Sequence, residues 1–332
     1  MNKEKILLGH GSGGKLMHEL LRDYFLPEFS IKEALDAALL SEIPGRIALT
    51  TDSYVITPIF FPGGDIGELS VNGTVNDLSM MGAKPLYLTA GFIIEEGFPL
   101  KDLKKILSSM SSAAKKAGVK IVAGDTKVVE KGKADGIFIN TSGVGVIPDG
   151  IEIHPKKIKP GDVVIVSGPV GTHGISIISK RNGLSFEPPL ISDTKALNYL
   201  VDELIKASIE IHAMRDPTRG GLATTLKEIA SQSGLSIEIE EERIPVLAPV
   251  KGACEILGLD PLYSANEGIM VLFVSPEDAQ RTVEILREKG EDLSTIIGIV
   301  KEEPSGKVIL KTKIGGTRLL EMLSGEQLPR IC

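Results

Sequence analysis

Three successive stretches decide the fold: RIALTTDS at 46–53, DIGELSVNGTVNDLSMMGA at 65–83 and KPLYLTAGFII at 84–94. The first and the third are apolar runs of strand length, which predicts β-strands. The middle stretch has helical spacing, with Asp65 as its N-cap and Gly82 near its end. A strand, a helix and a second strand in succession indicate a mixed α/β (α+β) domain.

Further elements follow on both sides of these stretches. KLMHELLRDYF (15–25) and LKDLKKILSSMSSAAKKAG (100–118) have helical spacing, and Gly118 closes the second helix. After a junction at 147–162 that is rich in Pro, Gly and Lys, strands and helices alternate again. We therefore expect two tandem domains, with an arm and helix at 1–40, an N-terminal domain at 41–150, a C-terminal domain at 160–312, and a final segment at 313–332 that holds a short helix at about Arg318–Leu323 and a flexible tail.

The composition excludes several classes of protein. The 332 residues carry 37 basic and 44 acidic side chains, a net charge of −7, which argues against nucleic acid as the main partner. Apolar runs are too short for a membrane span, and the N-terminal apolar stretch is too short for a secretory signal. Two cysteines form neither a disulfide framework nor a zinc cluster. The expected location is the cytoplasm.

The N-terminal segment GHGSGGKL (9–16) is rich in glycine. Gly9, Gly14 and Lys15 match the spacing of a phosphate-binding loop, but Leu16 stands where a magnesium-binding hydroxyl is needed. A weaker interpretation fits better, in which backbone N–H groups and Lys15 cover an anion. A plain N-terminal arm remains an equal alternative.

Several aspartates stand beside predicted strands or glycines in the first half of the chain. Mg²⁺ prefers carboxylate oxygens, and nucleotide phosphates need such a cation. Any single aspartate is more often a cap or a solvated turn residue, but the group as a whole favours a metal–nucleotide site. Its members are Asp36, Asp52, Asp77 and Asp125.

Two motifs in the second half carry charge at predicted element ends. In RDPTRGG, Asp216 and Pro217 are predicted as N-cap and first residue of a helix, and Arg219 beside this start favours an anion site over an ordinary cap. In YSANEG, Glu267 precedes a predicted strand. It is a candidate general base if it faces a pocket, and otherwise a solvated turn residue.

The chain ends in PRIC. Pro329 keeps the end extended, and the terminal thiol of Cys332 suits a carrier of a covalent group. The alternative is an incidental terminal residue. Cys254 is predicted to be a buried core residue on a helix.

These motifs occur together in one known family. HGSGGKLM, the long stretch TTDSYV to MMGAKP, AGDTKVV, MRDPTRGG, YSANEG and the final PRIC together resemble the HypE family of hydrogenase maturation factors. That family lies within the ATP-dependent enzymes related to aminoimidazole ribonucleotide synthetase and selenophosphate synthetase. The resemblance covers essentially the whole chain, and the PRIC ending is its most specific part.

The resemblance implies a fold, an activity and partners. It implies a homodimer whose N-terminal domains pair into a β-barrel, with ATP and Mg²⁺ in a cleft beside it. It also implies that Cys332 accepts a carbamoyl group from a HypF-type carbamoyltransferase. ATP-dependent dehydration then yields a thiocyanate, whose cyanide passes to iron on a HypC–HypD-type scaffold for the [NiFe] centre.

Residue roles follow from the same resemblance. Asp36, Asp52, Asp77 and Asp125 match acidic metal and nucleotide positions, Glu267 and Lys127 are candidates for proton removal and charge stabilisation, and Lys15 is a candidate phosphate ligand. One alternative is a phosphotransferase like selenophosphate synthetase or thiamine-monophosphate kinase. Another is a non-catalytic thiol carrier or scaffold.

Overall fold

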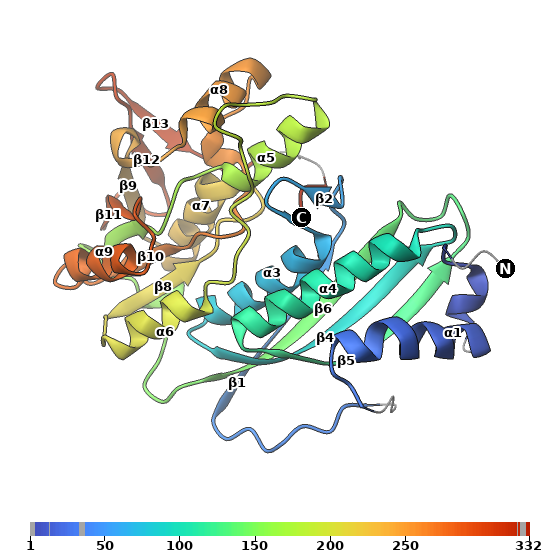
Figure 1. Cartoon of the computed structure of the whole chain (residues 1–332). Coiled ribbons are helices and arrows are strands. Elements are labelled where there is room, and N and C mark those ends of the chain that lie inside the picture. The colour runs from blue at the N-terminus through green and yellow to red at the C-terminus, as the bar shows by residue number, and fades with distance from the viewer. Residues whose placement is uncertain (1–3, 13, 33–36, 324, 326–329) are drawn as a thin grey trace.

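In the computed structural model, which describes residues 4–12, 14–32, 37–323, 325 and 330–332, a four-stranded sheet forms the N-terminal domain. Its strand order is β1-β6-β4-β5, and only the β4–β5 pair within it is parallel. Helices α3 and α4 pack against one face of the sheet (Figure 1). The elements are β1 (Arg46–Tyr54), β2 (Phe60–Phe61), β3 (Gly64–Asp65), α3 (Ile66–Met80), β4 (Lys84–Glu95), α4 (Leu100–Ala117), β5 (Lys120–Val129) and β6 (Ile137–Ile147).

An N-terminal arm packs beside this domain along strand β5 and helix α4. The arm consists of η1 (Leu8–Gly11), α1 (Lys15–Leu20), the π-helical turn η2 (Leu21–Phe25) and α2 (Leu26–Glu28). The helix predicted at 15–25 is therefore confirmed as helical backbone, with a π-helical second half.

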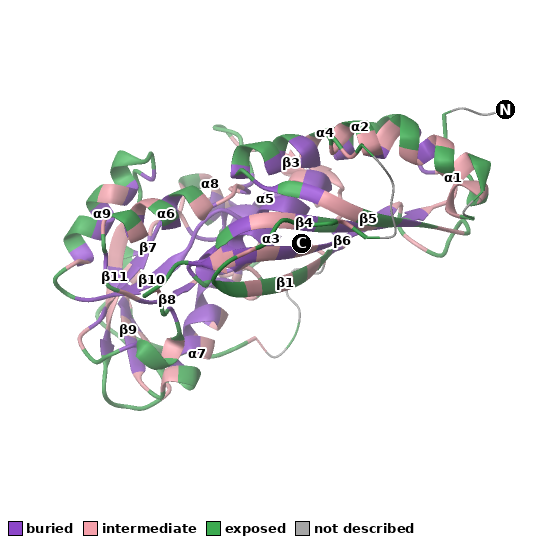
Figure 2. Ribbon diagram, turned by 90° about the horizontal axis from the view of Figure 1, so that it is seen from below, coloured by how far each residue is buried: buried purple, intermediate pink, exposed green. Residues whose placement is uncertain are grey.

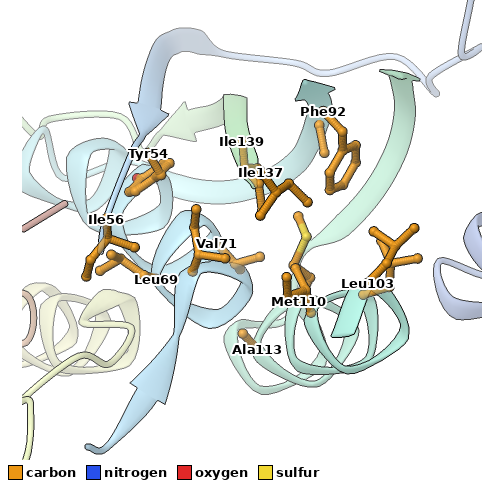
Figure 3. Packing of buried hydrophobic residues seen from close by; sticks show 14 of the residues in the cluster. Tyr54, Ile56, Leu69, Val71, Phe92, Leu103, Met110, Ala113, Ile137 and Ile139 are labelled. Atoms are coloured by element: carbon orange, nitrogen blue, oxygen red, sulfur yellow. The ribbon is translucent and has the colours of Figure 1, made fainter. Parts of the chain in front are cut away.

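Helix α3 forms where the sequence predicts it. The Asp65 carboxylate accepts hydrogen bonds from the backbone N–H groups of Gly67 at 2.7 Å and Glu68 at 3.1 Å. These bonds satisfy free N–H groups of the first turn. The helix is buried along almost its whole length, because the sheet, α4 and the C-terminal domain surround it. Figure 3 shows Leu69 and Val71 of α3 beside Tyr54 and Ile56 in this core.

The C-terminal domain is built on a seven-stranded sheet of order β13-β12-β9-β11-β7-β10-β8. Alternate residues of β7 face two separate cores: Val164 and Val166 pack toward α7, and Ile165 packs toward α6 and α9. The elements are η3 (Pro155–Lys157), β7 (Val163–Val166), α5 (Thr172–Arg181), α6 (Asn198–Lys206), β8 (Ile211–Arg215), α7 (Gly221–Ser233), β9 (Ser236–Glu240), η4 (Glu241–Arg243), α8 (Ala248–Leu257), η5 (Pro261–Tyr263), β10 (Val271–Val274), α9 (Ala279–Glu288), β11 (Thr295–Lys301), β12 (Val308–Lys311) and β13 (Thr317–Leu320).

Two local predictions are wrong. The predicted helix at Arg318–Leu323 is instead strand β13, which pairs with β12 through a hairpin and buries Leu320. The segment is too short to be stable as an isolated helix, and pairing with a sheet edge satisfies its backbone instead. The helix predicted to begin at Asp216 and Pro217 starts at Gly221, because Gly220 has a left-handed φ of 75° that a helix from Pro217 could not include.

The two domains meet along α3. The Asn76 side chain donates to the carbonyl of Lys195 at 3.1 Å and accepts from the N–H of Leu197 at 2.8 Å. Met80 of the same helix packs in a core of the C-terminal domain. Helix α3 thus brings the carboxyl group of Asp77 to the boundary between the domains.

The face of the N-terminal sheet that α3 and α4 leave uncovered exposes apolar side chains. Ile47 and Leu49 of β1 are 54% and 73% exposed, and Ile93 of β4 is 45% exposed. Figure 2 shows the exposed surface along β1. Among the described residues, no helix combines the length and apolar character that crossing a membrane requires.

Candidate functional site

Four acidic side chains from both domains meet at the domain boundary. Asp52 comes from β1, Asp77 from α3, Asp216 from the end of β8, and Glu267 from the segment before β10. Asp216 and Glu267 are 7% and 3% exposed. Burying like charges together is unfavourable unless protons or a cation neutralise them.

The pKa values of Asp77, Asp216 and Glu267 are raised because these carboxyl groups are buried and like charges lie close together. Burial, then Asp216 and Asp52, raises the pKa of Asp77 to about 7. Burial, followed by the charges of Asp216 and Asp193, raises the pKa of Glu267 well above its usual value. Burial also raises the pKa of Asp216. A site of this kind is suited to bind a cation and to hold a base with a shifted pKa.

Hydroxyl groups orient the two N-terminal carboxylates. The Thr50 hydroxyl donates to Asp77 at 2.8 Å, and the Tyr54 hydroxyl donates to Asp52 at 3.3 Å. Burial and the Asp52 charge raise the pKa of Tyr54 well above its usual value, so the phenol keeps its proton. A Cβ atom at Gly73 would overlap the Tyr54 hydroxyl, so only glycine lets α3 come this close.

Other predicted residues lie outside this acidic cluster. Asp125 and Lys127 are neighbours on β5, joined by an ion pair of 3.0 Å with both side chains more than 60% exposed. Lys15 is exposed on α1 and pairs with Glu19 at 3.8 Å. Arg219 is exposed in the turn before α7. Asp36 lies outside the described residues.

The fit to Mg²⁺ rests on the carboxylates at the domain boundary. Within the described part of the chain, no group of three or more His, Cys, Asp or Glu side chains is arranged to hold a metal ion by itself. Mg²⁺ commonly takes one or two carboxylates and completes its shell with phosphate oxygens and water. The charge of Asp52 makes ionisation of Asp77 more costly. A cation between the two carboxylates would offset that cost, so Asp52 and Asp77 fit the carboxylate part of such a Mg²⁺ site.

A cavity of about 700 Å³ lies between the N-terminal arm and strands β4 and β5. Phe25, Ile31, Leu39 and Phe92 give it an apolar lining, and Asp125 lies among its polar lining residues. A mostly apolar cavity with few polar groups is typical of a small-ligand site.

The C-terminal tripeptide is docked beside the end of β1. The N–H of Val55 donates to the carbonyl of Cys332, and the N–H of Thr57 donates to that of Arg330, both at 3.1 Å. Ile331 is 6% exposed and packs into the N-terminal core. The acceptor candidate Cys332 is thus held by Val55, the residue directly after β1. In Figure 1 the C-terminus lies beside β2.

The sequence analysis missed several side chains that hold this arrangement. His173, Arg181 and Asp135 all contact the terminal residues: His173 and Arg181 meet main-chain carbonyls, and Asp135 pairs with Arg330 at 2.5 Å. Asp193 accepts hydrogen bonds from the backbone at Glu267. No local motif marks these residues, because they become neighbours through the fold. The prediction that Cys254 is buried on a helix is confirmed, on α8.

Comparison with known families divides the chain in two. Residues 35–147 match the family described as AIR synthase related protein, N-terminal domain. Residues 159–311 match AIR synthase related protein, C-terminal domain. Both matches agree with two tandem domains of mixed α/β structure.

Full-length relatives are more specific. The chain is 50% identical to carbamoyl dehydratase HypE of Azotobacter vinelandii, over 97% of this chain and 96% of that protein. A crystal structure of hydrogenase maturation protein HypE in complex with ATP matches with a TM-score of 0.95 and 47% identity, over 98% of this chain and 99% of that one. A HypE–HypF complex matches with a TM-score of 0.81 and 50% identity, over 93% and 100%.

Proposed function

The chain belongs to the HypE family of carbamoyl dehydratases, and from that premise we propose that it dehydrates a carboxamide on its own Cys332 at the expense of ATP. The relative from Azotobacter vinelandii is named a carbamoyl dehydratase, and a hydrogenase maturation protein HypE that is 47% identical to this chain was solved with ATP. The observation that carries the proposal is the docking of Cys332 on Val55, just beyond the strand that holds Asp52.

The chemistry requires that an amide oxygen leave from carbon. In R–S–C(=O)NH₂ this oxygen is a poor leaving group, but transfer of the γ-phosphoryl group to it gives an imidate ester. Loss of phosphate and of both N–H protons then leaves R–S–C≡N, with ADP and inorganic phosphate as the other products. The sulfur–carbon bond is kept throughout.

The chain's own residues supply the proton and charge chemistry. Glu267, with its raised pKa, is a strong base for the nitrogen-bound protons once it is ionised. Asp52 and Asp77 would hold Mg²⁺, which when bound neutralises the phosphates. Three exposed residues complete the proposed set: Lys127 for charge stabilisation, Lys15 as a phosphate ligand, and Asp125 as a metal or nucleotide ligand.

Further nucleotide contacts are proposed for the remaining predicted residues. The apolar cavity lined by Phe25 and Phe92 suits the flat face of a nucleobase. Asp216 adds to the charge at the domain boundary that a cation would offset, and Arg219, exposed in the turn before α7, is proposed as an anion contact. Asp36 is retained as a nucleotide and metal residue on the family resemblance alone.

Partners are proposed from chemistry and surface. A HypF-type carbamoyltransferase is the donor to Cys332, in line with the HypE–HypF complex of a relative. The product thiocyanate then passes to iron on a HypC–HypD-type scaffold. A homodimer, with N-terminal sheets closing into a barrel, would cover the exposed Ile47, Leu49 and Ile93. A reaction that needs ATP and a reduced thiol fits the cytoplasm.

The direct test is mass spectrometry of the C-terminal peptide. After loading with carbamoyl donor and carbamoyltransferase, the peptide should gain a carboxamide, and MgATP should then remove the mass of one water. Cys254→Ala is the matched control, because it removes the other thiol and should behave like the parent. Cys332→Ala should neither load nor consume ATP. A parent peptide that loads but never loses water would overturn the dehydration.

The rival functions predict other outcomes. A phosphotransferase would consume ATP equally in the Cys332→Ala variant. A thiol carrier would load Cys332 without any ATP turnover. ATP consumption and loading of the parent and of the Cys332→Ala variant therefore distinguish all three functions.

A further inference from the structure

The segment between α5 and α6 contacts the N-terminal domain. Two hydrogen bonds join its middle to that domain: the N–H of Ser192 donates to the carbonyl of Pro62 at 2.8 Å, and the carbonyl of Lys195 accepts from Asn76 at 3.1 Å. We call residues 192–195 the crossing segment. None of its residues was selected by the sequence analysis.

One end of the crossing segment contacts the docked tail through His173. The Nε2 atom of His173 lies 2.5 Å from the carbonyl oxygen of Ile331, and Nδ1 lies 2.7 Å from the Ser192 hydroxyl. A carbonyl can only accept, so Nε2 carries the proton and Nδ1 accepts from Ser192. Burial lowers the pKa of His173 to about 4, so the ring is neutral at physiological pH.

The same hydroxyl also accepts a hydrogen bond, and the His173 ring has an aromatic neighbour. Ser192 Oγ also accepts from the N–H of Thr194 at 3.1 Å, and the ring of Phe61 packs edge-on against His173 with centroids 5.6 Å apart. His173 has no exposed surface. A buried ring with both nitrogens bonded and its orientation fixed by an aromatic neighbour has a single position.

The next residue of the crossing segment holds Glu267. The Asp193 carboxylate accepts from the backbone N–H of Glu267 at 3.2 Å and of Gly268 at 3.1 Å. In return, the N–H of Lys195 donates to the carbonyl of Glu267 at 3.3 Å. A Cβ at position 268 would overlap the backbone of Asp193, so glycine is needed for this close approach.

We propose that the crossing segment sets the position of the Cys332 tail relative to Glu267, with His173 and Asp193 as the two positioning residues. His173 fixes the main chain one residue before the acceptor sulfur. Asp193 fixes the backbone of the carboxyl group that takes the amide protons. The adjacent residues Ser192 and Asp193 thus hold the tail, through His173, and the backbone of Glu267. This inference rests on the proposed function for its catalytic part.

The tail contact is tested without any catalysis. His173→Leu removes the donor to Ile331, whereas His173→Gln keeps an N–H group of similar reach. We expect iodoacetamide to alkylate Cys332 about five- to tenfold faster in the Leu variant, from the loss of one buried hydrogen bond. The Gln variant should be closer to the parent. Cys254, which is 5% exposed, is the internal reference in the same peptide map. Equal rates in parent and Leu variant would overturn the role of His173.

The Glu267 contact is tested in single-turnover dehydration of preloaded protein. We expect Asp193→Ala to lower the rate at saturating ATP about 100-fold while the ATP concentration for half-maximal rate changes less than about twofold. Asp193→Asn, which keeps one acceptor oxygen, should recover part of the rate. Asp202→Ala is the matched control, because the Asp202 side chain on α6 is exposed. A parent-like rate in Asp193→Ala, or an effect confined to ATP affinity, would refute the positioning role.

The outcomes separate this inference from the proposed function. If the parent itself makes no thiocyanate, the proposed function fails, while the alkylation result still decides the tail contact. If the parent is active and Asp193→Ala is folded by circular dichroism yet slow, the positioning role stands. If Asp193→Ala does not fold, Asp193→Asn carries the same comparison.

Discussion

At the scale of single residues, placement alone changes what a carboxyl group does. Asp77 has the same side chain as exposed Asp149, but burial and then the charges of Asp216 and Asp52 raise the pKa of Asp77 to about 7. The sequence indicated Asp77 because it stands before a glycine turn and a strand. It held no sign of Asp193 or His173, whose partners lie far away in the chain.

Replacing Asp77 with asparagine should make stability less dependent on pH. The folded pKa of about 7 lies above the unfolded value, so the stabilising effect of the protonated carboxyl is present below about pH 4 and lost as pH rises to 7. As pH rises from 4 to 8, the free energy of unfolding of Asp77→Asn should therefore increase relative to that of the parent by on the order of 2–4 kcal/mol. Urea unfolding without magnesium measures this, with Asp149→Asn as control. A difference that does not change with pH would contradict the shifted pKa.

The same substitution should weaken nucleotide binding. The amide of the Asp77→Asn variant would still accept from the Thr50 hydroxyl but would carry no charge for a cation. We expect calorimetry to show MgATP binding weakened about tenfold or more, a loss of at least about 1.4 kcal/mol. Unchanged affinity would remove Asp77 from the proposed metal site.

At the scale of elements, local signals predict the helices and strands that carry their own start and stop residues. Helix α3 has its Asp65 cap, and α4 ends at Gly118 with a φ of 71°, as the sequence predicts. Strand β13 was missed because its partner β12, not its own pattern, decides its conformation. The start of α7 was misplaced because a left-handed Gly220 is not distinguishable from a helical one by sequence.

Glycine at position 73 should be required for the packing of α3. Gly73→Ala would place a methyl group against the Tyr54 hydroxyl and should destabilise the fold by about 1–3 kcal/mol. Gly252→Ala in α8 is the matched control, because nothing lies near a Cβ there and the change should stabilise by about 0.5–1 kcal/mol. Urea unfolding midpoints measure both stability changes. If both variants are stabilised, or both destabilised, the close approach of position 73 to the Tyr54 hydroxyl is refuted.

At the scale of the whole molecule, the junction at 147–162 and the strands and helices on both sides of it predicted two tandem domains, and the comparisons confirm them. Geometry between distant segments could not be predicted. The carboxyl groups of Asp77 and Glu267 meet only because α3 enters the C-terminal domain, and no periodicity encodes that. Asp125, grouped with the same aspartates by sequence, lies apart on β5.

The exposed sheet face makes the proposed homodimer testable. Leu49, 73% exposed in the single chain, should become buried if two sheets close into a barrel. Leu49→Lys should then convert the dimer to a monomer in light scattering after size exclusion. Ile256→Lys, on α8 and 67% exposed, should leave the assembly unchanged. A dimeric Leu49→Lys protein would place the interface elsewhere.

The buried amide of Asn76 has a consequence for motion. It bonds Lys195, Leu197 and, at 3.4 Å, the carbonyl of Glu267, so swinging the two halves apart would break all of these bonds at once. A hinge at this point is therefore costly, and the halves should travel as one rigid unit. Any movement that presents the Cys332 thiol to another protein must then break the hydrogen bonds of residues 330–332, while the two domains stay together as one frame.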